Sequence, residues 1–219
     1  MEGRRGRFDR RRIAMKIGII GSGNVGGNLG MLWARAGHDV FFSSRHPDRL
    51  ARLVEAAGPR AQRGTVPEAS EFGEVLLFAP NFWSADKALA AAGSMDGKVL
   101  IDATNPYKIG AGGIARALPE TTTAAAEFAK AVPAARVVKA YSTVPADYLT
   151  GDPDRRKGVA VFFCGDDEPA KSVVASLIAD SGFEPLDIGP LDRAGEIEIP
   201  GRLQKAGMLP VEEARKLLG

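Results

Sequence analysis

The stretch that decides the fold of this chain is Lys16-Ile17-Gly18-Ile19-Ile20-Gly21-Ser22-Gly23-Asn24-Val25-Gly26. Its first half, Ile17 to Ile20, is a short apolar run rich in β-branched residues, which predicts a strand buried on both faces. After it, apolar residues recur at helical intervals up to Ala36, and Gly37 stands where a left-handed helix C-cap belongs. The stretch therefore predicts a strand, a glycine turn and a helix in direct succession.

The glycines of this turn have the G-x-G-x-x-G spacing, at Gly21, Gly23 and Gly26. In a dinucleotide site, the first glycine permits the tight turn, the second lets backbone amides approach a pyrophosphate, and the third lets the helix pack on the strand. The motif is weak alone and stronger between a strand and a helix, although an ordinary strand–turn–helix corner is the alternative. We expect cofactor contacts from Gly21, Ser22, Gly23, Asn24, Val25 and Gly26.

The end of the next strand indicates which dinucleotide binds. Asp39 to Phe42 reads as that strand, and Ser43-Ser44-Arg45-His46 follows it without the carboxylate that holds the ribose of NAD. Ser44 can donate a hydroxyl to a 2′-phosphate, and Arg45 offers a planar fork that suits phosphate. Arg49, one helical turn further on, is expected to close the pocket. A solvated basic loop is the alternative, but the pattern favours NADP over NAD.

These residues also resemble a known family, the NADP-dependent oxidoreductases that use the deazaflavin coenzyme F-420. Gly21-Ser22-Gly23-Asn24 and Ser44-Arg45 fit its cofactor motifs, and the runs Val138–Ala146 and Cys164–Asp167 match further along, so that the resemblance covers about Met15 to Pro190. The resemblance implies that Val138 and Ala140 flank the nicotinamide. Related ferric reductases and other small NADPH enzymes share the same cofactor half, so the acceptor stays open.

Apolar runs and helical patterns alternate along the rest of the chain, which predicts a Rossmann-type, doubly wound and mostly parallel sheet in an α/β fold. Ligands of such sheets lie at the carboxyl ends of the strands. Ala79, Pro80 and Asn105 stand at such ends, and we expect them to contact the cofactor, although residues such as Asn105 also make ordinary turns. Four aromatic residues are expected to line the acceptor side of the site: Phe82, Trp83, Tyr107 and Tyr141.

Composition divides the chain into three parts. The first fourteen residues carry six arginines against Glu2 and Asp9, so the net charge of +2 belongs to this segment and the remainder favours no nucleic-acid partner. We expect residues 1–14 to be a disordered basic extension, residues 15–190 to be the NADP-binding domain, and residues 191–219 to be a helical appendage. The appendage is expected either to dock on its own sheet or to pair with a second subunit. No run is long and apolar enough for a membrane span, and the single Cys164 suits a reducing cytoplasm.

The missing groups limit the chemistry. The only histidines, His38 and His46, lie on the adenosine side, no metal-ligand cluster stands out, and no catalytic side chain is predicted. Direct hydride transfer between NADPH and a planar acceptor fits best, because the protein then supplies placement alone. A deazaflavin (coenzyme F-420) is the leading acceptor, in a cytoplasmic homodimer. The alternatives are an NADPH reductase of a flavin, imine, quinone or ferric complex, or a non-catalytic NADP-sensing module.

Overall fold

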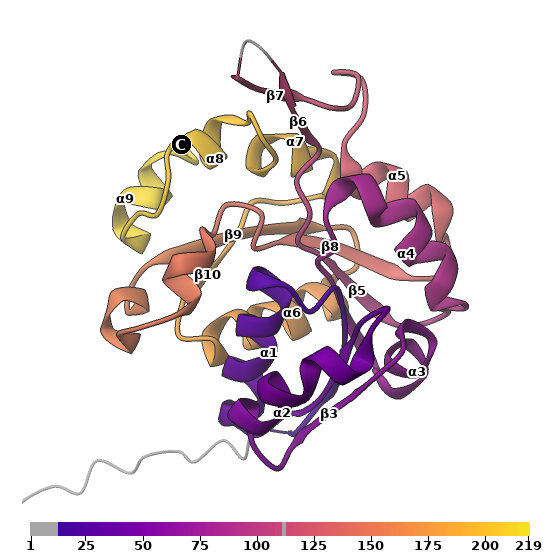
Figure 1. Cartoon of the computed structure of the whole chain (residues 1–219). Coiled ribbons are helices and arrows are strands. Elements are labelled where there is room, and N and C mark those ends of the chain that lie inside the picture. The colour runs from indigo at the N-terminus through magenta and orange to yellow at the C-terminus, as the bar shows by residue number, and fades with distance from the viewer. Residues whose placement is uncertain (1–12, 111–112) are drawn as a thin grey trace, which may run out of the picture.

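The predicted first strand, β1 (Lys16–Ile20), lies inside an eight-stranded sheet of order β10-β9-β8-β5-β4-β1-β2-β3 (Figure 1). The computed structural model describes residues 13–110 and 113–219, so most of the basic extension lies outside the described residues. The six strands from β8 to β3 are parallel, whereas β9 runs antiparallel to β8 and pairs in parallel with β10. The expected α/β, mostly parallel architecture is confirmed. The remaining strands of the sheet are β2 (Asp39–Ser43), β3 (Ala61–Gly64), β4 (Val75–Phe78), β5 (Val99–Asp102), β8 (Arg136–Ala140), β9 (Ala160–Gly165) and β10 (Glu184–Asp187).

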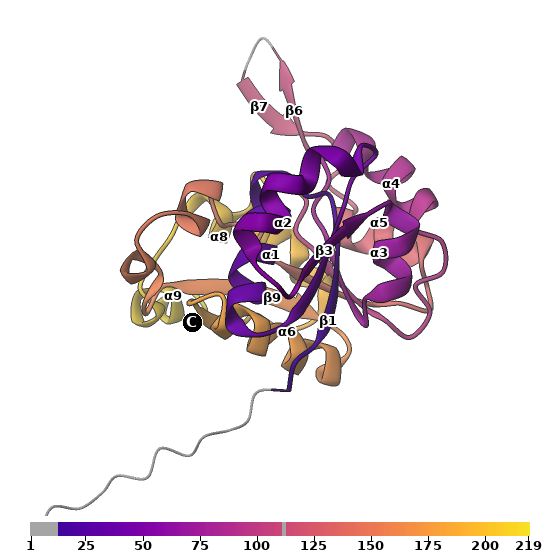
Figure 2. The ribbon, with the colours of Figure 1, turned by 60° about the horizontal axis from the view of Figure 1, so that its bottom comes forward.

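Helices cover both faces of the sheet. Figure 2 shows α1 and α2 on one side of the strands and α3, α4 and α5 on the other. Their bounds are α1 (Asn24–Ala36), α2 (Ala51–Ala57), α3 (Val66–Phe72), α4 (Ala85–Ala92) and α5 (Ala124–Ala131), and α6 (Glu168–Asp180) packs with α1. Short 3₁₀ turns precede several elements: η1 (Pro47–Leu50), η2 (Phe82–Ser84), η3 (Ala146–Leu149), η4 (Pro153–Arg156) and η5 (Leu191–Arg193).

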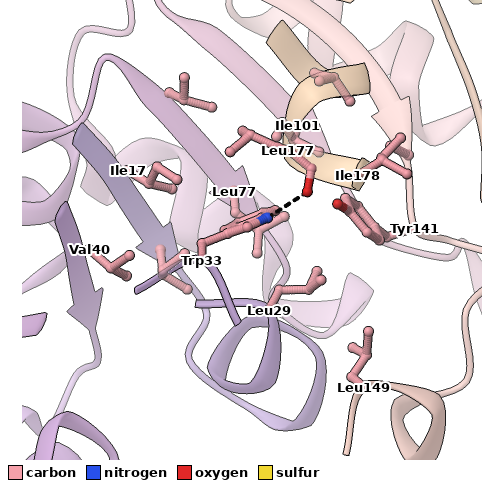
Figure 3. Close-up of a cluster of buried hydrophobic side chains, with 14 of the residues drawn as sticks. Ile17, Leu29, Trp33, Val40, Leu77, Ile101, Tyr141, Leu149, Leu177 and Ile178 are labelled. Carbon is pink, nitrogen blue, oxygen red and sulfur yellow. Dashed lines mark hydrogen bonds between the residues drawn. The ribbon is translucent and has the colours of Figure 1, made fainter. Parts of the chain in front are cut away.

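The indole ring of Trp33 packs in the core between α1 and α6. Trp33 is fully buried, its Nε1–H donates to the carbonyl of Leu177 at 2.8 Å, and its ring meets Tyr141 edge-on at 6.0 Å (Figure 3). This contact corrects one expectation, because Tyr141 was expected to line the acceptor side. Its ring is instead part of the core, and its hydroxyl lies 3.2 Å from that of Ser181. Tyr141 also has a left-handed backbone (φ 63°), which turns the chain away at the end of β8.

The C-terminal residues dock on their own sheet. This part contains α7 (Ala194–Ile197), α8 (Arg202–Lys205) and α9 (Val211–Lys216), and α8 was not anticipated from the sequence. The amide of Ala160 at the start of β9 donates to the carbonyl of Leu209, and the amide of Val211 donates to that of Gly158. Ala214 is fully buried in the core on this face. Of the two predicted alternatives, the structure therefore shows self-docking.

A two-stranded hairpin was also missed. The strands β6 (Tyr107–Gly110) and β7 (Gly113–Arg116) pair antiparallel and extend away from the body in both views (Figures 1 and 2). Ile109 and Ile114 pair across it, and both side chains are largely exposed. Across the described ranges, 13–110 and 113–219, no helix has both the length and the apolarity that a bilayer crossing requires.

Candidate functional site: the cleft at the glycine turn

The three glycines of the turn differ in what surrounds them. Gly21 has φ +99°, and a Cβ there would lie 2.6 Å from the backbone nitrogen of Pro80. A Cβ on Gly26 would lie 2.2 Å from the carbonyl oxygen of Gly21, so this position requires glycine for close packing. Around Gly23, in contrast, nothing lies within 4 Å of such a Cβ. The middle glycine is therefore the one that faces open space, as a backbone that approaches a pyrophosphate must.

The N-terminus of α1 is open to an anion. Its N-cap is Gly23, which provides no side-chain hydrogen bond to the first amides, and no acidic residue stands in the first turn. Such a helix end presents unpaired N–H groups and the positive end of the helix dipole. A phosphate is the group that this arrangement binds best.

Hydroxyl groups tie the turn to the end of β2. The Ser22 hydroxyl accepts the amide N–H of Ser43 at 3.1 Å, and the Ser43 hydroxyl is buried and donates to the carbonyl of Ile19 at 2.6 Å. The Ser44 hydroxyl accepts the amide N–H of His46 at 3.0 Å, which leaves its own proton available to a ligand. Ser44 is thus held at the edge of the cleft with a donor to spare.

A cleft of about 380 Å³ lies between this turn, the end of β2 and α4. Two cations line it, Arg45 from the β2 loop and Lys87 from α4, and no carboxylate does. Neither cation has an ion-pair partner within the part of the chain that the structure describes. A cleft that holds unpaired positive charge beside an open helix N-terminus suits a ligand with several phosphate groups.

Seven of the predicted cofactor residues line this cleft: Gly21, Ser22, Gly23, Ser44, Arg45, Ala79 and Pro80. The rest of the predicted set does not line it. Asn24, Val25 and Gly26 continue into α1, and Arg49 is exposed on η1 beside the cleft. Lys87 and Ser84 also line the cleft and were not predicted. An exposed lysine in an amphipathic helix such as Lys87 is usually a solvated side chain, so nothing in the sequence was a reason to select it.

The predicted residues at the ends of β5 and β8 are engaged within the protein. Val138 and Ala140 are fully buried in the core on the α1 face. The Asn105 side chain donates to the carbonyl of Ser142 at 2.7 Å and accepts the amide N–H of Ile199 at 3.0 Å. Direct contact between these three residues and a cofactor stays a prediction.

A buried ion cluster lies below those strand ends and was not foreseen. Lys139 of β8 lies 2.7 Å from Asp102 of β5 and 3.1 Å from Glu198, which follows α7, and all three side chains have no exposed surface. The carbonyl of Thr104 accepts the third ammonium hydrogen at 2.7 Å. Burial alone would lower the pKa of Lys139, but the charges and hydrogen bonds of the two carboxylates raise it above its usual value. The Lys139 ammonium is therefore held in its charged form inside the fold.

Within the described residues, no group of three or more histidine, cysteine, aspartate or glutamate side chains is arranged to hold a metal ion. Cys164 is buried in β9, and burial raises the pKa of its thiol to about 12. The candidate site is thus a cleft lined by two cations, followed by strand ends at which Asn105 and Ser142 are hydrogen-bonded within the protein.

Comparison with known proteins agrees with this geometry. The family model described as NADP oxidoreductase coenzyme F420-dependent matches residues 16–106. Metalloreductase STEAP3 of Rattus norvegicus is 32% identical over 199 residues, which are 90% of this chain but only 38% of that protein. The chain thus spans less than half the length of this curated relative.

Two crystal structures are similar over most of both chains. A protein from Arthrobacter sp. FB24, proposed to be an F420-dependent NADP reductase, is 29% identical with a TM-score of 0.74, over 83% of this chain and 87% of that chain. A hypothetical protein from Sinorhizobium meliloti is 26% identical with a TM-score of 0.76, over 85% and 91%. The glycine turn and the cleft residues therefore lie in the part of this chain, residues 16–106, that matches the family of NADP-dependent oxidoreductases described as NADP oxidoreductase coenzyme F420-dependent.

Proposed function

We propose that this protein transfers a hydride between NADP(H) and a planar acceptor, and that the acceptor is the deazaflavin coenzyme F-420. The observation that carries the cofactor half is the cleft, where an open glycine turn meets Ser44 and two cations, Arg45 and Lys87, with no carboxylate on its walls. When bound, NADPH supplies the hydride. The protein's part is to hold the cofactor and the acceptor in reach of each other.

The roles of the cleft residues follow from their positions. Gly23 and the first amides of α1 would take the pyrophosphate, because no side chain covers them. Ser44 and Arg45 would take the 2′-phosphate together with Lys87 of α4, which lines the same cleft, and Arg49 of η1 is expected to approach from outside the cleft lining. A carboxylate at the end of β2, which would repel that phosphate and favour NAD, is absent from the sequence there.

The redox end favours an acceptor that needs no proton from the protein. The five residues that follow each of β4, β5 and β8 include no carboxylic acid, lysine or histidine, and of the two tyrosines among them, Tyr107 and Tyr141, the second is buried in the core. Two carboxylates below the β5 and β8 ends, Asp102 and Glu198, are fully buried and paired with Lys139. Reduction of a carbonyl would require an acid beside the developing alkoxide. A deazaflavin ring takes a hydride and spreads the resulting charge over its own ring system, so it makes no such demand.

The two named reductases among the similar proteins favour a deazaflavin as the acceptor over a metal complex. The Arthrobacter protein matches this chain over 87% of its own length. The metalloreductase matches over 38% of its length, so most of that protein has no aligned counterpart here. Reduction of a ferric complex, through this domain or a bound flavin, is the second candidate, and the 32% identity over 90% of this chain is the observation that favours it.

Anaerobic mixing of NADPH with oxidised coenzyme F-420 tests the proposal. We expect the visible absorbance of the deazaflavin to disappear with NADPH and to remain with NADH at equal concentration. Parallel reactions contain a free flavin or a ferric chelate in place of the deazaflavin. Tight NADPH binding without transfer to the deazaflavin in either direction would refute it, and turnover with the ferric chelate alone would establish the second candidate.

Two expectations about the whole molecule stay predictions. The homodimer is checked by sedimentation of the purified chain. The cytoplasmic location agrees with a single free and buried cysteine, and fractionation of the source cells checks it.

A further inference from the structure

Three consecutive residues of the C-terminal part are each bonded to the strand ends. The carbonyl of Ile197 accepts the Ser142 hydroxyl at 2.8 Å, the Glu198 carboxylate lies 3.1 Å from Lys139, and the amide of Ile199 donates to Asn105 at 3.0 Å. The bonded side chains come from β8, the loop after β8 and the loop after β5. Segment 197–199 is therefore fixed at every residue to the carboxyl edge of the sheet.

Asn105 is the joint of this arrangement. Its amide NH₂ donates to the carbonyl of Ser142 at 2.7 Å, while its oxygen accepts the N–H of Ile199. One carboxamide thus connects the end of β5, the loop after β8 and the C-terminal part. Only a side chain with a donor and an acceptor on one planar group satisfies both partners, and aspartate at this position would face the Ser142 carbonyl with an oxygen.

Glu198 holds the same segment from below. Its two carboxylate oxygens accept the amides of Ala124 and Ala125 at 3.2 Å each, at the N-terminus of α5, in addition to the contact with Lys139. The side chain is fully buried. A buried carboxylate is stable only when it is paired and hydrogen-bonded in this way, so the position of the segment is strongly specified.

The place of the segment relative to the cofactor follows from the sheet, and this step rests on the proposed function. The 2′-phosphate end lies at β2, and the strand order continues through β1, β4 and β5 to β8. With about 4.8 Å between neighbouring strands, β5 and β8 lie about 14 and 19 Å from β2. An extended dinucleotide that crosses the glycine turn therefore places its nicotinamide over the β5 and β8 ends, where Asn105 and Ser142 stand.

We propose that Asn105 is a positioning residue that builds the redox end of the site by fixing segment 197–199 against the ends of β5 and β8. Both polar atoms of its carboxamide have partners within the protein, so the proposed effect on the nicotinamide passes through the segment and the Ser142 loop. The C-terminal part thereby becomes a wall of the redox end, while the adenosine end, built from β2, the glycine turn and α4, does not depend on it.

Two ligands allow the adenosine end and the redox end to be tested separately. 2′,5′-ADP carries the adenosine half alone, and NADPH adds the nicotinamide, whose fluorescence reports its surroundings without any acceptor. In Asn105→Ala and Asn105→Asp we expect the Kd of 2′,5′-ADP to stay within about twofold, and the Kd of NADPH to rise by about two- to tenfold, the effect of one hydrogen bond. The emission of bound NADPH should move toward that of free NADPH.

Ser142→Ala provides a second variant, because it removes the bond to Ile197 and leaves both bonds of Asn105. Its matched control is Ser176→Ala, which removes a hydroxyl-to-carbonyl bond on the exposed side of α6. Folded variants that bind both ligands with wild-type affinity and wild-type emission would overturn this inference but not the proposed function. An equal loss of affinity for both ligands would have the same consequence. A wild type that binds neither ligand would overturn the proposed function as well.

Discussion

Replacement of Arg45 by alanine tests the assignment of the 2′-phosphate. Hydrogen bonds to charged groups contribute about 1.5–3 kcal/mol, which is about 10- to 150-fold in Kd. Arg45 is exposed at the mouth of the cleft, so solvent and salt screen its charge and place the effect at the lower end. We therefore expect NADPH to bind about tenfold more weakly at physiological ionic strength, with a larger loss at low salt, and NADH to change by less than about twofold.

Calorimetric titration of both cofactors against both proteins measures the effect. Arg52→Ala is the matched control, because Arg52 is exposed on α2, has no ion-pair partner within the described residues and does not line the cleft. Its affinities should equal those of the wild type. If Arg45→Ala weakened NADPH and NADH by the same factor, the side chain would act on a part common to both cofactors, and the assignment would be refuted.

Three further changes have defined outcomes. Lys87→Glu should weaken NADPH more than Lys87→Ala does and should spare NADH, as cofactor titrations would show; an equal effect on both cofactors would remove Lys87 from the phosphate site. Lys139→Met leaves two buried carboxylates without their cation, which should lower the free energy of unfolding by about 3–5 kcal/mol. The Tm should therefore fall by about 6–20 °C. Because the raised pKa of Lys139 keeps it charged through neutral pH, the stability of the wild type should not change there through this group, and thermal melts of the wild type at pH 5 and pH 8 check this. The Cys164 thiol, whose pKa is raised to about 12 by burial, should resist a disulfide reagent at pH 8 until denaturant unfolds the chain; rapid labelling of the native protein would contradict its burial.

The parts of the fold that the sequence predicted are those with local causes. The apolar run before Gly21, the glycine spacing and the left-handed Gly37 lie within one short stretch, and β1 and α1 form there as expected. The hairpin of β6 and β7 was missed because its four-residue strands bury no continuous apolar face, and Ile109 and Ile114 remain exposed. The glycine-rich sequence between the two strands, residues 110–113, was the available signal.

The candidate site divides along the same line. Gly23, Ser44 and Arg45, which line the cleft, could be predicted because each lies close to a strand end in the sequence. The internal hydrogen bonds of Asn105 could not be predicted in this way. Its partner Ile199 is 94 residues away in the sequence, and only the tertiary fold brings both of its bonding partners to its side chain. From sequence, an asparagine before a proline could equally have bound the cofactor or made a turn.

Lys139 decides the question that the sequence left open about the C-terminal part. Its ammonium has three hydrogens, which meet Asp102, Thr104 and Glu198, so the chain itself satisfies every donor. If residues 191–219 instead reached toward a second subunit, Glu198 would leave this position, and the amides of Ala124 and Ala125 would lose their acceptor. A buried lysine would then face one carboxylate, with an unsatisfied donor inside the sheet. Docking on its own sheet is therefore favoured by the hydrogen bonds that Glu198 accepts inside the core, and we expect any dimer to form through surfaces that leave Glu198 in place.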